Sequence, residues 1–250
     1  VITSSFSGEA VIWDAQTGRD LLHMQGHGSV AFSCDFSPDG RLALTVSKDG
    51  SARLWSAQGG EEACTLGIEG TRLRSASFAP RSSFLPPSVL AVGESGDVAL
   101  WEAPAGRVLQ RWSGRRVAGA VFSPCGGRLL FTTRDYCVWL LALAPDGGPG
   151  EGPGEGPGPG AEVRLCESET YEMQLASFSP CGRFVLTAGC GVTGAVCLWD
   201  ALSQQKLCEH EAMPGVVSGV NKAGFSPCGG RLLVATYNGM VAVWGRGPAF

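Results

Sequence analysis

Tryptophan recurs along this chain at a nearly even interval, each time near the end of a short apolar run. Six tryptophans follow this pattern, with gaps of 42, 46, 38, 60 and 45 residues: Trp13, Trp55, Trp101, Trp139, Trp199 and Trp244. A second mark, Phe followed by Ser-Pro or Ala-Pro, keeps the same period: Phe36, Phe78, Phe122, Phe178 and Phe225. Two marks that share one period indicate an internal repeat, which constrains the fold more than any single residue does.

The best-formed repeat, residues 26–67, predicts four short antiparallel strands. We place them at residues 30–36, 41–47, 51–55 and 61–66. Between the first two stands Ser37-Pro-Asp-Gly40, where proline fixes φ and glycine tolerates the left-handed conformation that closes a turn. Lys48-Asp-Gly50 is a hairpin sequence of the Asp-Gly type. A sheet of this size cannot bury both faces by itself, so the repeats must pack against one another.

The hairpin ahead of each tryptophan also recurs. Glycine stands five residues before five of the six tryptophans: Gly8, Gly50, Gly96, Gly194 and Gly239. The Trp139 repeat has Arg134-Asp-Tyr136 instead, which we interpret as a shortened turn. This repeat also precedes the longest gap, which falls to 45 residues once the glycine- and proline-rich run from Asp146 to Gly160 is removed. We therefore predict a flexible insert over residues 145–160.

These features resemble the WD-repeat β-propeller family, whose four-stranded blades carry Gly-His near the start and Trp-Asp at the end of the third strand. Trp-Asp is literal at Trp13-Asp14 and Trp199-Asp200, and Gly-His at Gly26-His27. The resemblance implies an all-β propeller of about six visible blades. We interpret residues 1–250 as a single propeller segment. Its blades fall roughly at residues 1–25, 26–67, 68–112, 113–168, 169–210 and 211–250.

The first and last of these blades are incomplete. The opening blade lacks its first strand and the last lacks its fourth, so we expect 22 strands. We interpret the chain as a segment of a larger protein, and we expect that protein to contain more than one propeller.

The family also implies a hydrogen-bonded relay that joins a histidine, a hairpin aspartate, a strand hydroxyl and the tryptophan. One blade matches every position, through His27, Asp49, Ser47 and Trp55. A buried imidazole and a buried indole N–H need partners, and the relay supplies them. We expect His27→Ala to lower thermal stability.

Composition argues against several functions. The net charge is −4, with 19 basic and 23 acidic residues, which gives no general attraction to nucleic acid or to an anionic membrane. The longest apolar run, from Cys137 to Ala144, is too short to cross a bilayer as a helix. Ten cysteines without a C-x-x-C pair favour reduced thiols. Cys208-x-His210 lacks a second metal-ligand pair.

No cofactor, metal site or catalytic acid–base pair is expected, and we predict that the chain is not an enzyme. In this family, residues just ahead of the hairpins and in the loops that enter the first strands lie on one rim. By that resemblance the candidate partner-binding residues are Phe6, Lys48, Glu94, Arg134, Val192 and Tyr237, with Arg72, Arg74, Arg115, Arg116 and Tyr171 from the entering loops. Arginine and tyrosine are common interface anchors.

The sequence therefore predicts a non-catalytic protein-interaction scaffold that binds other proteins or peptides. The arginine cluster favours acidic or phosphorylated partners. We expect a cytoplasmic location, with the cytoskeleton, centriole, cilium and nucleus left open. One alternative is a substrate receptor of a cullin-type ubiquitin ligase, but Gln16 and Leu202 stand where such receptors carry arginine after Trp-Asp. Nucleic-acid binding through the arginine cluster is a weaker alternative.

Overall fold

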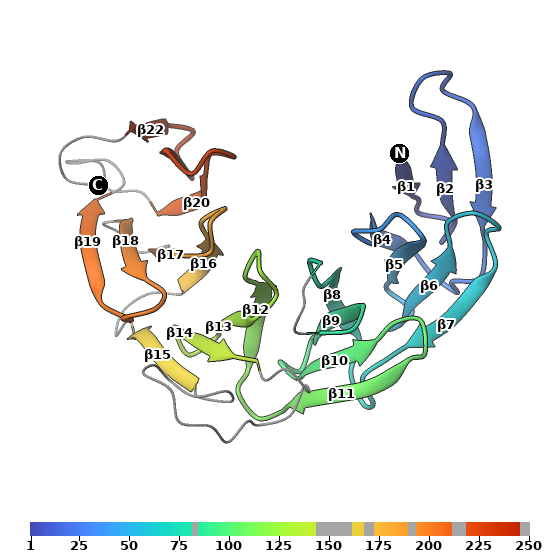
Figure 1. Ribbon diagram of the computed structural model, residues 1–250, viewed down its shortest axis with the longest axis horizontal. Helices are drawn as coiled ribbons and strands as arrows, with labels where there is room; N and C mark the ends of the chain where they lie inside the picture. Colours follow the sequence, from blue (N-terminus) through green and yellow to red (C-terminus); the bar gives the residue numbers. More distant parts are fainter. Residues whose placement is uncertain (82–84, 144–161, 168–172, 190–193, 212–218, 246–250) are drawn as a thin grey trace. The chain divides into compact units, whose positions relative to one another are not determined.

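The structure is a computed structural model that describes residues 1–81, 85–143, 162–167, 173–189, 194–211 and 219–245 (Figure 1). Within these ranges all regular structure is β, and 22 strands form six antiparallel sheets of three or four strands. Two compact units divide the chain, residues 1–117 and 118–250. The predicted all-β class is confirmed, including the three-stranded first and last sheets expected for incomplete blades.

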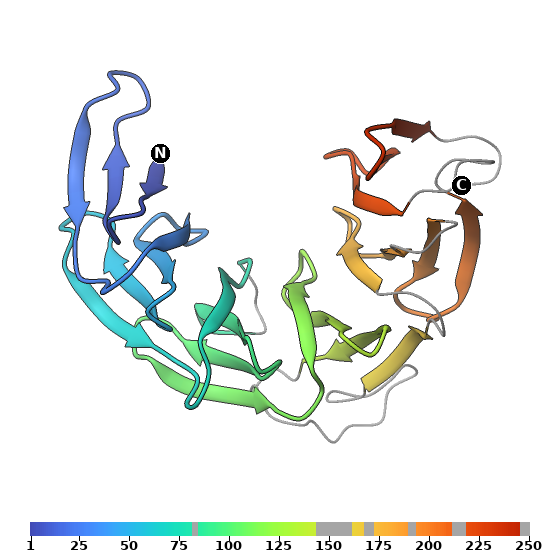
Figure 2. The ribbon, with the colours of Figure 1, turned by 180° about the vertical axis from the view of Figure 1, so that it is seen from behind.

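The first unit contains three sheets, each built from strands that are consecutive in the sequence. The sheet β4–β7 contacts both of its neighbours, as the two opposite views show (Figures 1 and 2). The strands are β1 (Ile2–Ser4), β2 (Ala10–Trp13), β3 (Asp20–Met24), β4 (Ala31–Phe36), β5 (Leu42–Ser47), β6 (Ala52–Ser56), β7 (Glu62–Leu66), β8 (Leu73–Phe78), β9 (Ser88–Gly93), β10 (Val98–Glu102) and β11 (Arg107–Trp112).

The second unit repeats this plan in its own three sheets, and the sheet β16–β19 contacts both of the others. The strands are β12 (Val117–Phe122), β13 (Arg128–Thr133), β14 (Cys137–Ala142), β15 (Glu162–Glu167), β16 (Met173–Phe178), β17 (Phe184–Gly189), β18 (Ala195–Asp200), β19 (Lys206–Glu211), β20 (Val220–Phe225), β21 (Arg231–Thr236) and β22 (Val241–Gly245). The predicted insert, residues 145–160, lies outside the described residues.

The Ser-Pro turn between the first two strands of a sheet is closed by its serine. The Ser37 hydroxyl accepts a hydrogen bond from the Leu42 amide at 2.9 Å, and Gly40 adopts the left-handed conformation with φ of 73°. The same serine-to-amide bond recurs at Ser123, Ser179 and Ser226, each at 3.0 Å. The turn sequence thus fixes where the second strand begins, and with it the register of the hairpin.

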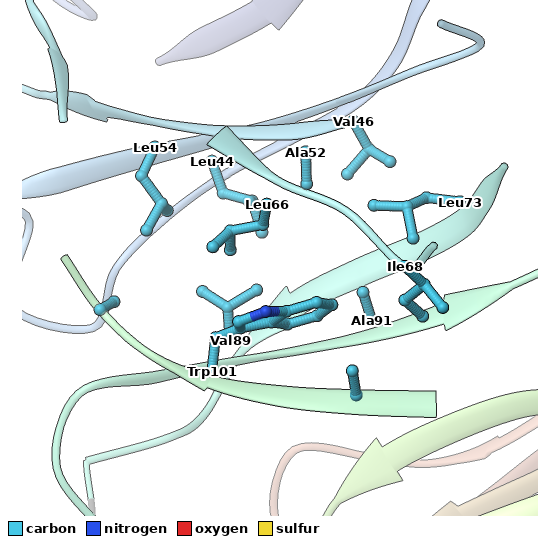
Figure 3. Close-up of a cluster of buried hydrophobic side chains, with 12 residues drawn as sticks. Leu44, Val46, Ala52, Leu54, Leu66, Ile68, Leu73, Val89, Ala91 and Trp101 are labelled. Atoms are coloured by element: carbon cyan, nitrogen blue, oxygen red, sulfur yellow. The ribbon is translucent and has the colours of Figure 1, made fainter. Parts of the chain in front are cut away.

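The cores lie between neighbouring sheets. Figure 3 shows the cluster in which Leu44 and Leu54 of the sheet β4–β7 face Val89 and Trp101 of the sheet β8–β11. All four side chains are buried. Because burying one such side chain contributes about 1.5–3 kcal/mol, each sheet is stabilised mainly by the sheets beside it.

One predicted feature, the shortened Trp139 hairpin, is wrong. The hairpin between β13 and β14 keeps the register of the one between β5 and β6, because Thr132 pairs with Val138 as Val46 pairs with Ala52. Tyr136 takes the glycine position with φ of 65°. Strand pairing aligns Leu129 with Leu141, just as Ala43 aligns with Trp55. Leu141 therefore occupies the core position that tryptophan holds in the other sheets, and Trp139 stands two residues earlier on the strand.

Candidate interaction surface

A chain of hydrogen bonds crosses the interior of the sheet β4–β7. The Trp55 indole N–H donates to the Thr45 hydroxyl at 2.8 Å, and that oxygen lies 2.7 Å from His27 Nε2. His27 Nδ1 lies 2.9 Å from the Asp49 carboxylate. An ionised carboxylate only accepts hydrogen bonds, so we place the imidazole proton on Nδ1 and let Thr45 donate to Nε2. This arrangement gives the Trp55 indole N–H, the Thr45 hydroxyl and both His27 ring nitrogens a hydrogen-bond partner.

The hydroxyl in this relay belongs to Thr45, so the prediction of Ser47 is wrong. Both residues lie on the same side of β5, because strand side chains alternate. Thr45 is close to the indole, whereas Ser47 ends the strand: its hydroxyl donates to the Ser29 carbonyl and accepts from the Asp49 amide, both at 3.1 Å. Ser47 therefore stabilises the hairpin turn, and Thr45 is the hydroxyl that binds the indole.

The sequence did contain a signal for Thr45. It stands ten residues before its tryptophan, as Thr3 stands ten before Trp13, and the indole N–H of Trp13 donates to Thr3 at 2.8 Å. Trp199 makes the same bond to Thr187 at 3.0 Å. Thus a threonine–tryptophan bond occurs in three sheets, and the sheet β4–β7 extends it to a histidine and an aspartate.

Asp49 connects this interior relay with the hairpin at the surface. Burial alone would raise the pKa of its carboxyl group, but hydrogen bonds from Ser51, His27 and the Gly28 amide outweigh burial and hold the pKa well below its usual range. The carboxylate lies 3.0 Å from the Gly28 amide, in the segment that leads into β4. The hairpin and the loop that enters the first strand of the same sheet are therefore tied together.

The same pairing of hairpin and entering loop occurs in other sheets through the backbone. The residue ahead of the hairpin turn donates its amide to the loop: Lys48 to the Val30 carbonyl at 2.9 Å, and Glu94 to the Arg72 carbonyl at 2.7 Å. In the second unit, the Tyr237 amide donates to the Gly219 carbonyl at 3.1 Å. These predicted partner-binding residues thus lie beside an entering loop.

Hairpin glycines also lie against the loop that enters the next sheet. A Cβ added to Gly50 would come within 3.7 Å of Arg72, and one added to Gly96 would lie 2.5 Å from the Arg116 Cα. At Gly8 such a Cβ would lie 2.6 Å from the Ser29 carbonyl oxygen. Hairpins and loops therefore alternate without a break along one face of the first unit, and we call this face the hairpin face.

The hairpin face carries several exposed basic side chains. Lys48, Arg72 and Arg116 are exposed and form no ion pair with the described residues. Arg116 has φ of 49°, so its backbone adopts the left-handed conformation beside Gly96. Arg74 is exposed and Arg115 is half-buried.

The remaining predicted contact residues do not all join this face. Glu94 is exposed and places a negative charge between Arg72 and Arg116 along the face. Phe6 is also exposed, in the first hairpin of the first unit. Arg134 and Tyr237 are exposed but belong to the second unit. Tyr171 and Val192 lie outside the described residues.

Sequence reasoning missed one polar pair on the hairpin face. The Ser95 amide donates to the Thr71 hydroxyl at 3.0 Å, and the Ser95 hydroxyl donates to Asp97. These contacts hold the third hairpin of the face, between β9 and β10, against its entering loop. Serine and threonine are common in such turns, so the sequence pattern does not single out these two residues.

The side chains and hollows of the described residues indicate which chemistry this part of the chain could support. No three His, Cys, Asp or Glu side chains in these ranges gather where they could hold a metal ion. A hollow of about 450 Å³ in the second unit is lined mainly by apolar groups, including Phe184, Leu198, Phe225 and Trp244. His210 lies edge-on to Trp244, with ring centroids 5.8 Å apart. No helix in the described ranges could span a bilayer.

The family model described as WD domain, G-beta repeat matches residues 18–56, which include His27, Thr45 and Trp55. The chain therefore contains a WD repeat at residues 18–56. Mouse and human coronin-7 are each 48% identical to it over 48 residues, 19% of this chain and 5% of coronin-7. Autophagy-related protein 16 from Arabidopsis thaliana is 31% identical over 111 residues, 44% of this chain and 21% of that protein. The chain thus spans only a small part of these relatives' length.

Proposed function

We propose that this WD-repeat chain is a non-catalytic protein-interaction scaffold and that the hairpin face of its first unit binds the partner. The observation that carries the proposal is the unbroken alternation of hairpins and entering loops, which holds exposed side chains from different sheets on one surface. A rigid scaffold that presents loop residues is the usual basis for recognition. WD repeats and the coronin-7 and autophagy-related relatives support such a role in general terms.

The charge on this face favours a partner with acidic side chains. Lys48, Arg72 and Arg116 offer exposed cationic groups, and arginine binds carboxylates in a planar two-bond geometry. Glu94 lies between Arg72 and Arg116, so we expect the acidic groups of the partner to be spaced apart rather than contiguous. A peptide in which acidic and small polar residues alternate fits this pattern.

We further propose a cytoplasmic location. Eight cysteines in the described ranges are free thiols, among them Cys34 and Cys125, as expected in a reducing compartment. A cytoskeletal, centriolar or ciliary scaffold is a narrower version of this proposal. The ubiquitin-ligase receptor finds no added support, because Gln16 and Leu202 stand where such receptors carry arginine after Trp-Asp.

Two measurements test the proposal separately. Proximity labelling in cells compares the wild-type chain with the double variant Arg72→Glu/Arg116→Glu. Arg41→Glu is the matched control, because Arg41 is an exposed arginine in a Ser-Pro turn, away from the hairpins. We expect the double variant to lose specific labelled proteins and the control to keep them. Equal labelling by all three chains would refute the hairpin face as the partner surface.

Fluorescence anisotropy then tests the chemistry of the partner. A short labelled peptide of alternating Glu and Ser should bind the wild-type chain, and affinity should fall as salt rises. The corresponding Lys–Ser peptide is the control. If the double variant loses cellular partners but neither peptide binds the wild-type chain, the hairpin face is supported as the partner surface. The prediction that the partner is acidic is then wrong.

A further inference from the structure

The second unit carries a cysteine at the same position of three Ser-Pro turns. Cys125, Cys181 and Cys228 each follow Ser-Pro directly, and each is an exposed free thiol. The equivalent turns of the first unit have Asp39 and Arg81 at this position. The Ser-Pro turns of the second unit therefore offer thiol chemistry that the corresponding turns of the first unit lack.

Contacts between neighbouring turns arrange the three cysteines in a row. A Cβ added to Gly182 would lie 3.6 Å from the Pro124 side chain, and one added to Gly229 would lie 3.6 Å from the Pro180 side chain. Each contact joins the glycine of one turn to the proline of the turn before it. Because every cysteine stands between the proline and the glycine of its turn, Cys181 is the middle member of the row. Its thiol is exposed although a turn lies on each side.

The Cys181 thiol has polar neighbours that favour its ionised form. Its Sγ lies 3.3 Å from the Ser179 hydroxyl oxygen, which accepts a hydrogen bond from the Phe184 amide at 3.0 Å. A thiolate carries no proton, so the serine hydroxyl is the donor when Cys181 is ionised. This bond and a further one from the Arg183 amide outweigh burial and lower the pKa of the Cys181 thiol. Because the thiolate is the nucleophilic form, Cys181 is poised to react with electrophilic sulfur.

The Arg183 guanidinium places a positive charge beside this thiol. Its side chain is 70% exposed, and its Nε donates to the Asp200 carboxylate at 3.3 Å. The guanidinium carbon also lies 5.4 Å from the centre of the Phe184 ring. These two contacts hold the group in place, and among the described residues neither occupies its terminal nitrogens. A guanidinium binds carboxylates through such nitrogens, so the Cys181 turn combines a nucleophile with a carboxylate receptor.

We propose that the Cys181 turn is a site of reversible thiol modification by small disulfides that carry carboxylates, such as glutathione disulfide. The Cys181 thiolate attacks one sulfur of the disulfide, a new S–S bond forms, and the original S–S bond breaks. The other half leaves with the electron pair as a thiolate and takes up the proton that Cys181 released. The disulfide is thus the oxidant, and Arg183 positions its carboxylate. This proposal is independent of the hairpin face.

Cys125 is an internal comparison within the same row. Its Sγ lies 3.4 Å from the Ser123 hydroxyl, so the serine contact is the same as at Cys181. The arginine of this turn differs, because Arg128 is half-buried and donates to the Ala201 carbonyl at 2.7 Å. We therefore expect Cys125 to react with disulfides but to prefer anionic ones less than Cys181 does.

Peptide mass spectrometry of the 250-residue chain tests the site. The chain is incubated at low salt with glutathione disulfide, which is anionic, or with cystamine, which is cationic. Each rate of mixed-disulfide formation at Cys181 is divided by the rate of the same reagent with 2-mercaptoethanol. We expect this relative rate to be about three- to fivefold higher for glutathione disulfide, and the preference to fall as salt rises. At Cys125 the preference should be smaller.

Variants of Arg183 separate its charge from its other contacts. Arg183→Gln should remove the preference at Cys181, whereas Arg183→Lys should keep part of it. Arg41→Gln is the matched control, because Arg41 has the same place in the Ser-Pro turn of the sheet β4–β7, where Asp39 replaces the cysteine. The control should keep the full preference, and circular dichroism verifies that each variant is folded.

Three results would overturn the proposal. The first is an equal relative rate for the two disulfides at Cys181 of the wild-type chain. The second is a preference for glutathione disulfide that survives Arg183→Gln. The third is a product in which Cys181 is joined to another cysteine of the chain and no glutathione is retained, since the turn would then form a disulfide within the protein.

Discussion

Replacing Thr45 by valine should destabilise the first unit by about 2–4 kcal/mol. Valine keeps the shape of threonine but removes the oxygen, so the substitution leaves the Trp55 indole N–H and His27 Nε2 without their partner. Thr45 is fully buried, Trp55 is 3% exposed and the His27 side chain is 1% exposed, so water cannot replace the lost bonds. A buried polar group left without a partner costs about 1–3 kcal/mol, and here there are two.

The assay is thermal unfolding followed by tryptophan fluorescence and circular dichroism. A loss of this size corresponds to a fall in Tm of roughly 5–15 °C for the transition of the first unit. Thr45→Ser restores the oxygen, so its Tm should lie much closer to that of the wild type. His27→Ala should also lower Tm, because it removes the partner of both Thr45 and Asp49.

Two further variants decide whether the hydroxyl assignment is right. Thr3→Val removes the equivalent bond to Trp13, but Thr3 is exposed and Trp13 is half-buried, so its cost should be smaller. Ser47→Ala removes only the bonds at the hairpin and should cost about 0.5–1.5 kcal/mol. If Ser47→Ala lowers Tm more than Thr45→Val does, the relay runs through Ser47 and the reasoning fails.

The Ser-Pro turns predict a difference in thiol reactivity. Hydrogen bonds from the serine hydroxyl and the turn amides lower the pKa of the Cys181 and Cys228 thiols. At Cys125, burial alone would raise the pKa of the thiol, but the same hydrogen bonds outweigh burial. Iodoacetamide at about pH 7 should therefore modify these three exposed thiols faster than Cys64 and Cys208, because burial raises the pKa of those two thiols. Peptide mass spectrometry measures the difference, and unchanged labelling of Cys181 in Ser179→Ala would contradict the role of the hydroxyl. The hairpin glycines give a matched pair, because Gly96 and Gly50 have similar φ values of 92° and 98°, but a Cβ would lie 2.5 Å from Arg116 at Gly96 and no closer than 3.7 Å to Arg72 at Gly50. Gly96→Ala should therefore be less stable than Gly50→Ala by about 1–3 kcal/mol in thermal unfolding, and equal losses would show that φ alone sets the cost.

The repeat predicted the architecture well because each local choice agrees with the same structure. In the second sheet, the strands expected at 41–47 and 61–66 are found at Leu42–Ser47 and Glu62–Leu66. Proline, glycine and serine at fixed positions determine the turns, and the turns determine the register. The error at Trp139 arose because the hairpin position was counted back from the tryptophan. In this repeat Leu141 fills the core position, and Tyr136 tolerates the conformation that glycine usually adopts.

The relay shows a different limit of sequence reasoning. Ser47 and Thr45 are both hydroxyl residues on the same side of one strand, so spacing and chemistry allow either to meet Trp55. The choice depends on how far the indole reaches along the strand, which is a matter of side-chain packing. On the hairpin face, likewise, the exposed residues could be predicted from the repeat, but the backbone contacts of Arg72 and Arg116 with neighbouring hairpins became visible only in the fold.

The exposed face of the last sheet carries this argument one step further. Leu44 and Leu233 stand at the same position after a Ser-Pro turn, yet they are 1% and 46% exposed. Their own strands do not account for the difference, since both lie in the second strand of an antiparallel sheet and both have aliphatic neighbours across the pair. What differs is whether another sheet covers them. The apolar pattern of a strand therefore encodes the capacity to be covered by a neighbouring sheet, whereas its burial depends on the packing between sheets.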